Sequence, residues 1–190
     1  MRNRGLLVLF GVFLLLAALL VLQDRGTIGG GNNTAIPTAF LLRVFPEMAV
    51  LDIQAIRLQN PASGQTLSLA RDDFGNWESF EYSEALDQNL ATTIARSVVL
   101  LPYTRTINLS EDTDIAQYGF DSPQFLLSVQ MVNGESHVVL VGDPLQTGPE
   151  FYALVDDREQ LYVIQRSPID YLVTFFADPP IIPDGASIAP

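Results

Sequence analysis

Apolar residues are most concentrated at the start of the chain. Residues 5–22 include no charged or strongly polar side chain, and Arg2 and Arg4 precede them. A helix of that length reaches about 27 Å, close to the hydrocarbon thickness of a bilayer. Arginine on the leading side keeps that side in the cytoplasm, so the rest of the chain is expected to cross. The pattern predicts that residues 1–25 form a cytoplasmic tip and a single transmembrane anchor.

The alternative interpretation of this stretch is a signal peptide that is cleaved. A signal peptide has a shorter apolar core, of about 7–15 residues, and a cleavage site made of small residues. Residues 23–25, Gln-Asp-Arg, do not form such a site, although Gly29 or Gly30 offers another position for cleavage. If the helix is retained, four small residues would let a partner helix approach closely in the membrane: Gly5, Gly11, Ala17 and Ala18.

Beyond the anchor, alternation of apolar and polar residues predicts strands. Residues 26–39 are rich in glycine and asparagine and are expected to form a flexible linker. The alternation that follows favours an antiparallel sheet, and Asn133-Gly134 is the strongest short hairpin signal. Strands are predicted at residues 51–60 with an irregularity near Ala55, 65–73, 77–82, 124–132, 135–142, 151–157 and 160–167, with a short extended piece at 104–109.

Apolar spacings of three and four residues predict the helices. Ser83 is expected to cap a helix that ends before Pro102. A short helix is expected from Ser110 to Gly119, because glycine favours the left-handed position that ends a helix. A last short helix is expected to begin at residues 167–168, Ser-Pro. The longest helix has one apolar stripe, formed by Leu86, Leu90, Ile94, Val98 and Leu101.

These elements together predict an α+β fold, with a transmembrane helix followed by an antiparallel sheet and packed helices. Strands and then a helix occur twice in the same order, which favours two related ββ(β)α halves. The exported domain is expected to span residues 40–176, and the proline-rich residues 177–190 are expected to form an irregular tail.

Composition narrows the range of functions. All 22 acidic residues follow the apolar stretch but only eight of the ten arginines do, so the exported part has a formal excess of 14 negative charges. Such a surface repels nucleic acids and anionic lipid head groups. The absence of cysteine excludes thiol catalysis, disulfides, iron–sulfur ligation and covalent haem attachment. The absence of lysine excludes Schiff-base chemistry.

Candidate catalytic groups are few. His137 is the only histidine, and on an alternating strand it shares a face with Val139, so we expect an exposed or hydrogen-bonded side chain rather than a base. Residues 73–75, Asp-Phe-Gly, are expected to form a hairpin turn, because no other kinase motif accompanies them. The acidic residues Glu111, Asp112 and Asp114 are expected to compensate a helix dipole rather than bind calcium. We assign no catalytic, cofactor-binding or metal-ligating residue, and no cofactor.

The second half of the chain carries a recognisable combination of turns. Residues 118–123 (Tyr-Gly-Phe-Asp-Ser-Pro) are followed by Asn133-Gly134, by residues 141–144 (Val-Gly-Asp-Pro) and by residues 151–155 (Phe-Tyr-Ala-Leu-Val). Over residues 45–175 the chain resembles a family of bacterial proteins that contain a domain of unknown function. The resemblance implies a single-span anchor and an exported β-rich domain, associated in some members with ABC transporters of the gliding-motility type. It supplies no catalytic residues.

The motif residues that carry this resemblance also have a structural interpretation. Gly119 is expected to end a helix, Pro123 to precede a strand, and residues 142–144 to end a strand. The predicted structural turns are Gly119, Pro123, Asn133, Gly134, Gly142 and Pro144.

These observations predict a non-catalytic accessory subunit of a multisubunit bacterial membrane complex. Its N-terminal helix would contact integral membrane subunits and the lipid bilayer, and its acidic domain, periplasmic or extracellular, would contact an exported protein partner. An electron-transport complex such as the quinol-oxidising alternative complex III is the leading candidate. The alternative is an auxiliary component of an ABC-type transporter that binds a polymer or peptide ligand outside the membrane. A free exported binding module, with its signal removed, is a third hypothesis.

Overall fold

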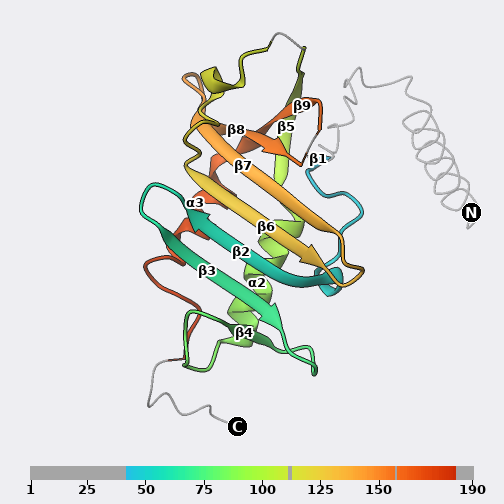
Figure 1. Cartoon of the computed structure of the whole chain (residues 1–190), viewed down its shortest axis with the longest axis vertical. Coiled ribbons are helices and arrows are strands. Elements are labelled where there is room, and N and C mark those ends of the chain that lie inside the picture. Colours follow the sequence, from blue (N-terminus) through green and yellow to red (C-terminus); the bar gives the residue numbers. More distant parts are fainter. Residues whose placement is uncertain (1–41, 111–112, 157, 183–190) are drawn as a thin grey trace, which may run out of the picture. The chain divides into compact units, whose positions relative to one another are not determined.

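The structure, a computed structural model, describes residues 42–110, 113–156 and 158–182. They form a nine-stranded sheet in the order β1-β5-β9-β8-β7-β6-β2-β3-β4, in which every neighbouring pair is antiparallel (Figure 1). The predicted antiparallel sheet with packed helices is therefore confirmed. The strands are β1 (Leu42–Arg43), β2 (Ile53–Asn60), β3 (Gln65–Arg71), β4 (Trp77–Ser79), β5 (Pro102–Asn108), β6 (Phe125–Met131), β7 (Ser136–Pro144), β8 (Glu150–Val155) and β9 (Gln160–Gln165). The helices are α2 (Gln88–Val99) and α3 (Arg166–Thr174), with the 3-10 helices η1 (Val50–Asp52) and η2 (Ile115–Tyr118).

Two meanders meet in the middle of the sheet. Strands β2, β3 and β4 form one and strands β6 to β9 form the other, and their first strands, β2 and β6, pair with each other. Helix α2 follows the first meander and helix α3 follows the second, in the order of elements predicted from the sequence. Strand β5, which follows α2, lies beside β9 at the other end of the sheet. The chain between β4 and β5 therefore crosses the sheet, and α2 makes that crossing (Figure 1).

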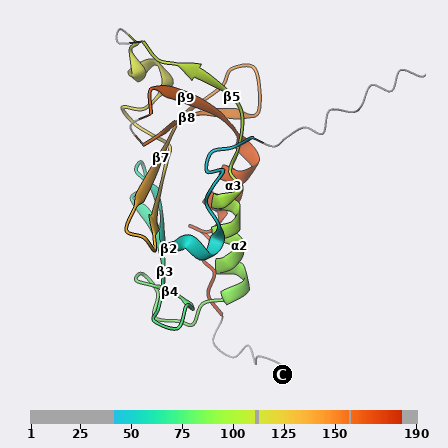
Figure 2. The ribbon, with the colours of Figure 1, turned by 90° about the vertical axis from the view of Figure 1, so that its right-hand side faces the viewer.

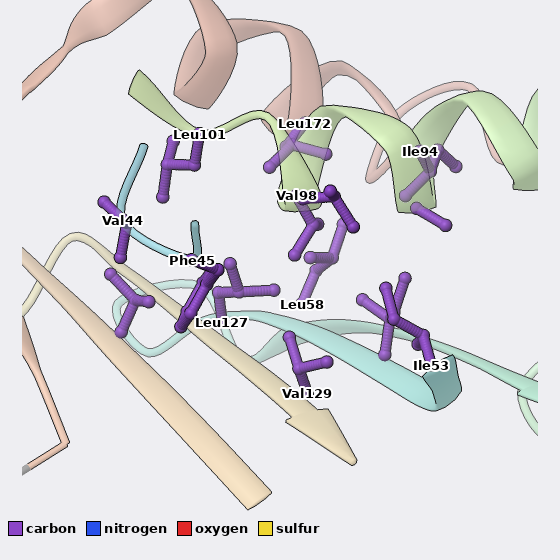
Figure 3. Packing of buried hydrophobic residues seen from close by; sticks show 14 of the residues in the cluster. Val44, Phe45, Ile53, Leu58, Ile94, Val98, Leu101, Leu127, Val129 and Leu172 are labelled. Carbon is purple, nitrogen blue, oxygen red and sulfur yellow. The ribbon is translucent and has the colours of Figure 1, made fainter. Parts of the chain in front are cut away.

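The two α-helices lie on one face of the sheet and enclose the hydrophobic core against it (Figure 2). Leu58 of β2 and Leu127 of β6 are cross-strand partners that point to this face, and both are fully buried. The apolar stripe of α2 packs toward them through Ile94 and Val98, and Leu172 of α3 lies beside it (Figure 3). Each such large aliphatic side chain contributes about 1.5–3 kcal/mol through burial, so this layer stabilises the domain.

The connection between β1 and β2 covers the same face at one end. We call residues 44–52 the entry segment, because they lead the chain into the central strand β2. Val44 and Phe45 point into the core (Figure 3), and Met48 is also buried. The backbone N–H of Val44 donates to the carbonyl oxygen of Leu101 at 2.9 Å. The entry segment is therefore part of the core layer.

The start of α2 differs from the prediction. Ser83 is not its N-cap; the helix begins at Gln88, and the Asp87 carboxylate accepts hydrogen bonds from the first free N–H groups of the helix. The reason is a tertiary contact, because Leu86 forms a β-bridge with Ile181 and the N–H of Asp87 donates to Pro180. Those bonds hold the chain extended before Asp87. They also give the first residues of the predicted irregular tail a defined partner.

Two other predicted helix starts are also wrong. Ser110 is not the N-cap of the helical turn that the structure describes here, because the 3-10 turn η2 begins at Ile115. Asp114 caps that turn by accepting from the N–H of Ala116 at 3.0 Å. Helix α3 begins at Arg166, one residue before the predicted Ser-Pro pair, which therefore lies in its first turn. Proline is tolerated there because the first N–H groups of a helix have no partner within it.

No helix in the part of the chain that the structure describes is long and apolar enough to cross a membrane. The predicted anchor, with Gly5, Gly11, Ala17 and Ala18, lies outside the described residues. The predicted linker, the acidic residues 111–112 and residues 183–190 of the tail lie outside them as well.

Candidate docking groove

A groove of about 590 Å³ lies between the entry segment and the tip of the β6–β7 hairpin. We call it the docking groove. Its floor is apolar, because Phe45, Met48 and Met131 line it and all three also belong to the hydrophobic core. Met48 and Met131 are the only methionines after Met1. Thioether side chains are flexible and polarisable, so such a floor can adapt to apolar groups of different shapes.

Strand register brings the walls of the docking groove together. Met131, at the end of β6, lies opposite Ile53 at the start of β2, and a register shift follows before Ala55. This shift confirms the predicted irregularity in the strand. The N–H of Val132 then donates to the carbonyl oxygen of Asp52 at 2.8 Å, which ties the hairpin to η1. The groove therefore forms where the hairpin tip meets the chain that leads into β2.

The rim of the groove combines exposed apolar and acidic side chains. Val132 lines this opening and is 64% exposed, which is unusual for a large apolar residue beside a buried floor. The carboxylates of Glu47, Asp52 and Glu135 line the same opening. All three are exposed; the Asp52 carboxylate accepts from the N–H of Ala49, and the Glu135 carboxylate accepts from the Asn133 amide. Exposed apolar residues rimmed by polar ones are typical of interaction sites.

His137 lies on the wall of the groove and is hydrogen-bonded, as predicted for this strand residue. Its Nδ1 atom is 2.9 Å from Oδ2 of Asp156, in the β8–β9 turn. The other carboxylate oxygen of Asp156 accepts from the N–H of Val138 at 2.7 Å. The imidazole ring also packs against the Phe45 ring, with 5.4 Å between their centres. His137 thus links the hairpin, the β8–β9 turn and the entry segment.

Arg158 brings the one positive charge to this groove, but its hydrogen bonds point inward. Its Nη1 donates to the carbonyl oxygen of Val44 at 3.3 Å and to the hydroxyl of Tyr162 at 2.6 Å. The guanidinium also lies 5.5 Å from the centre of the Tyr162 ring. Arg158 therefore fastens the entry segment to β9, and the exposed charges at the rim are the carboxylates.

A second depression, of about 360 Å³, lies on the face of the sheet opposite the helices. Arg57 alternates with the buried Leu58 along β2, so its side chain points to this opposite face. The hydroxyl-bearing residues Ser68 and Ser128 line the depression, together with Phe80, which is largely exposed. This surface is more polar than the docking groove.

Glu81 lies at the edge of this second depression and has a lowered pKa. Partial burial raises the pKa of its carboxyl, but hydrogen bonds from the hydroxyl and N–H of Ser68 and from the hydroxyl of Ser79 lower it more. The balance is a pKa below the ordinary value of 4.5. These bonds join the chain after β4 to the middle of β3.

The structure places the predicted turn residues Gly119 and Gly142 side by side. Gly119 ends η2 in the left-handed conformation, with φ of 83°, and a Cβ there would lie 2.5 Å from Cγ of Asp143. A Cβ on Gly142 would overlap the carbonyl oxygen of Tyr118 and lie 3.1 Å from the Phe120 ring. The two glycines let the η2 loop rest directly on β7, a contact that sequence spacing does not reveal.

The other predicted turn residues also lie at turns or strand ends. Asn133-Gly134 does form the β6–β7 hairpin, with Gly134 at φ of 90°, and Pro123 does precede β6. Residues 142–144 end their strand as predicted, because β7 stops at Pro144. Pro144 pairs with Phe151 after a register shift, so the motif forms an irregularity within the strand.

Sequence reasoning singled out His137 but missed the rest of the groove. Phe45, Met48 and Arg158 come from segments that are distant along the chain from the hairpin, and no spacing rule connects them. The rarity of methionine was the available signal, because both methionines after the first lie in this one site. Within the described residues, no group of three or more histidine, aspartate and glutamate side chains is placed to hold a metal ion.

Comparison of the chain with protein-family models, curated protein sequences and solved structures found no match.

Proposed function

We propose that this protein is a non-catalytic accessory subunit of a multisubunit bacterial membrane complex. The apolar residues 5–22 would anchor it as a single span, with the N-terminus in the cytoplasm and the acidic domain outside the cell membrane. The domain would dock an exported part of a partner subunit. The two meanders, each with its helix, would descend from one ββ(β)α unit.

The observation that carries this proposal is the docking groove. Its apolar floor, its exposed Val132 and its acidic rim combine the features of a protein interaction site. Its one imidazole is engaged with Asp156, and its one guanidinium is engaged with Val44 and Tyr162. These polar groups hold the walls in place, which fits docking better than proton transfer.

An electron-transport complex such as alternative complex III is the partner that we favour. A cysteine-free chain supplies no thiolate for an iron–sulfur cluster and no thioether link for haem. In such a complex this subunit would therefore position other subunits rather than carry electrons.

Gentle extraction of the tagged full-length protein, followed by mass spectrometry of the intact assembly, tests the proposal. We expect stoichiometric membrane partners, and we expect them to be lost from the double variant Glu47→Arg/Glu135→Arg. The matched control is Glu78→Arg/Glu84→Arg, which reverses two exposed charges outside the groove. Recovery of the chain alone would refute the accessory role. Full retention of partners by the groove variant would refute docking through this groove.

A second candidate function is supported by the depression on the opposite face. Its serine hydroxyls, Arg57 and the exposed Phe80 ring could contact an extended polymer or peptide. This surface favours an auxiliary component of an ABC-type transporter. Co-purification with an ATPase and a permease, together with ligand binding that is lost in Arg57→Ala/Phe80→Ala, would place this candidate first. Unchanged ligand binding in that variant would reject the surface.

A further inference from the structure

The docking groove also indicates the chemistry of its partner, an inference that rests on the proposed function. We propose that the groove binds a cationic protein segment that inserts an apolar anchor side chain between its basic residues. The partner segment would carry lysine or arginine on either side of a leucine-like residue.

The apolar half of the argument comes from the floor. Phe45, Met48 and Met131 are almost fully buried, yet they line an open groove whose volume of about 590 Å³ is within the range of ligand pockets. The exposed Val132 extends this apolar surface outward. An inserted apolar side chain would contact adaptable thioethers below and Val132 beside it. Such insertion is the typical anchor of a peptide-sized partner.

The negative charge of the rim favours basic residues on either side of the inserted apolar side chain. Glu47 and Glu135 are exposed at the opening, and Asp52 adds a third carboxylate that is fixed in the η1 turn. Arg158 is directed inward, to Val44 and Tyr162, and the three rim carboxylates outnumber its single positive charge. Charges at an interface rim mainly set partner choice and the rate of encounter. A basic segment is therefore favoured over a neutral or acidic one.

The net charge of the chain argues against the other occupants. After the apolar stretch the chain has 14 more acidic than basic residues, so an anionic lipid surface and a nucleic acid are both repelled. A second copy of the domain would bring a similarly acidic surface to the groove. A cationic segment gains from the same field, which steers it toward the domain.

His137 makes this inference measurable, because it is the only histidine and lies in the groove wall. The full-length protein, labelled at histidine and held in uncharged maltoside micelles, is titrated with a capped peptide of two leucines between pairs of lysines. We expect a saturable shift of the imidazole resonances. One control peptide has glutamate in place of lysine, and the other has serine in place of leucine.

The protein variant for this titration is Glu47→Gln/Glu135→Gln, which removes two rim charges without adding new ones. We expect about three- to tenfold weaker binding of the lysine–leucine peptide, because each exposed ion pair contributes modestly. Glu78→Gln/Glu84→Gln is the matched control and should bind as the unmodified protein does. Raising the salt concentration should weaken binding to the unmodified protein, because exposed charges are screened.

Several results would overturn the inference. One is the absence of a saturable shift with the lysine–leucine peptide. Another is binding of the glutamate or serine peptide as tightly as the lysine–leucine peptide. A third is binding of the lysine–leucine peptide by Glu47→Gln/Glu135→Gln as tightly as by the unmodified protein. A larger shift with phosphatidylglycerol vesicles than with the peptide would overturn it in favour of a lipid surface. A shift that changes with the concentration of the protein alone would indicate self-association and would overturn it in favour of a second copy.

The same variants separate this inference from the proposed function. If no cationic peptide binds but Glu47→Arg/Glu135→Arg still loses its membrane partners, the groove docks a partner of different chemistry and only this inference fails. If the peptide binds as expected but the charge-reversed protein keeps all its partners, the chemistry of the groove stands and the docking role fails.

Discussion

The substitution Gly142→Ala tests the contact between the η2 loop and β7. An alanine Cβ at this position would clash with the carbonyl oxygen of Tyr118, at less than 3.0 Å. It would also lie 3.1 Å from the Phe120 ring. Gly142 is not in the left-handed region, so alanine itself fits the backbone. The cost of the substitution must therefore come from the clash with the loop.

Two limits bound that cost. If the loop moves slightly and stays in place, overpacking destabilises the domain by about 1–3 kcal/mol. If the loop detaches, the buried Phe120 ring is exposed, and on the order of 150–250 Å² of aromatic surface at about 25 cal/mol per Å² gives about 4–6 kcal/mol. The loop is expected to take the smaller distortion, because that costs less free energy. The clash is with a backbone oxygen, however, so rotating a side chain cannot relieve it. We therefore expect a loss of about 2–3 kcal/mol, or a fall in Tm of about 4–12 °C.

Urea unfolding of the full-length protein in uncharged micelles measures this loss. Trp77 is the only tryptophan and is buried beneath the Arg71 guanidinium, 4.1 Å from the centre of its ring, so its fluorescence reports unfolding of the domain. Gly148→Ala is the matched control, because its Cβ would meet only the Glu150 carboxylate at 3.5 Å, an ordinary contact. We expect the control to be unchanged or stabilised, by no more than about 1 kcal/mol.

Equal unfolding midpoints for Gly142→Ala and Gly148→Ala would refute this reasoning. Alanine in place of glycine also restricts the unfolded chain, which stabilises by about 0.4–1 kcal/mol and acts in both variants. The difference between the two variants therefore isolates the clash. A difference near zero would mean that the η2 loop does not rest on β7.

Three further predictions use the same unfolding assay. Leu127→Ala removes a fully buried side chain from the layer under α2 and should cost about 2–5 kcal/mol, whereas Leu127→Met should cost less than about 1.5 kcal/mol. Asp87→Ala removes the cap of α2 and should cost about 1 kcal/mol, and Asp87→Asn should restore most of it; equal losses in both variants would argue against capping. Glu81→Gln removes a carboxylate whose pKa in the folded protein lies below 4.5. Because the pKa is lowered on folding, the ionised carboxylate stabilises the fold at neutral pH. This contribution is lost as the pH falls through the lowered pKa. Unfolding at a series of pH values should therefore show the variant less stable at neutral pH and equal to the unmodified protein in strong acid; a pH-independent difference would contradict the role of the charge.

The sequence predicted the elements whose evidence is local. The stripe that contains Ile94 and Val98 identified α2 and its buried face, because periodicity depends only on neighbouring turns of the same helix. The Asn133-Gly134 hairpin and the irregularity near Ala55 were found for the same reason. In each case the residues that decide the structure are close together in the chain.

The predicted start of α2 failed because a distant segment intervened. Ser83 is a good N-cap residue, yet the bridge between Leu86 and Ile181 keeps the chain extended past it, and Asp87 takes the role. Local propensity was overruled there by hydrogen bonds to a segment that local patterns cannot identify.

The sequence by itself determined that the chain has an acidic, cysteine-free domain of alternating strands behind an apolar N-terminal stretch, since charge, composition and period are properties of the chain alone. It also determined that His137 has no second histidine as a partner. Only the tertiary structure decided that His137 faces Phe45 and Asp156, and that both later methionines form the floor of one groove. The physical reason is that the groove arises from the strand order, which pairs β2 with β6 and lays the entry segment beside their ends. That order is set by burial of the whole core, to which every strand contributes and which no single stretch of the sequence encodes.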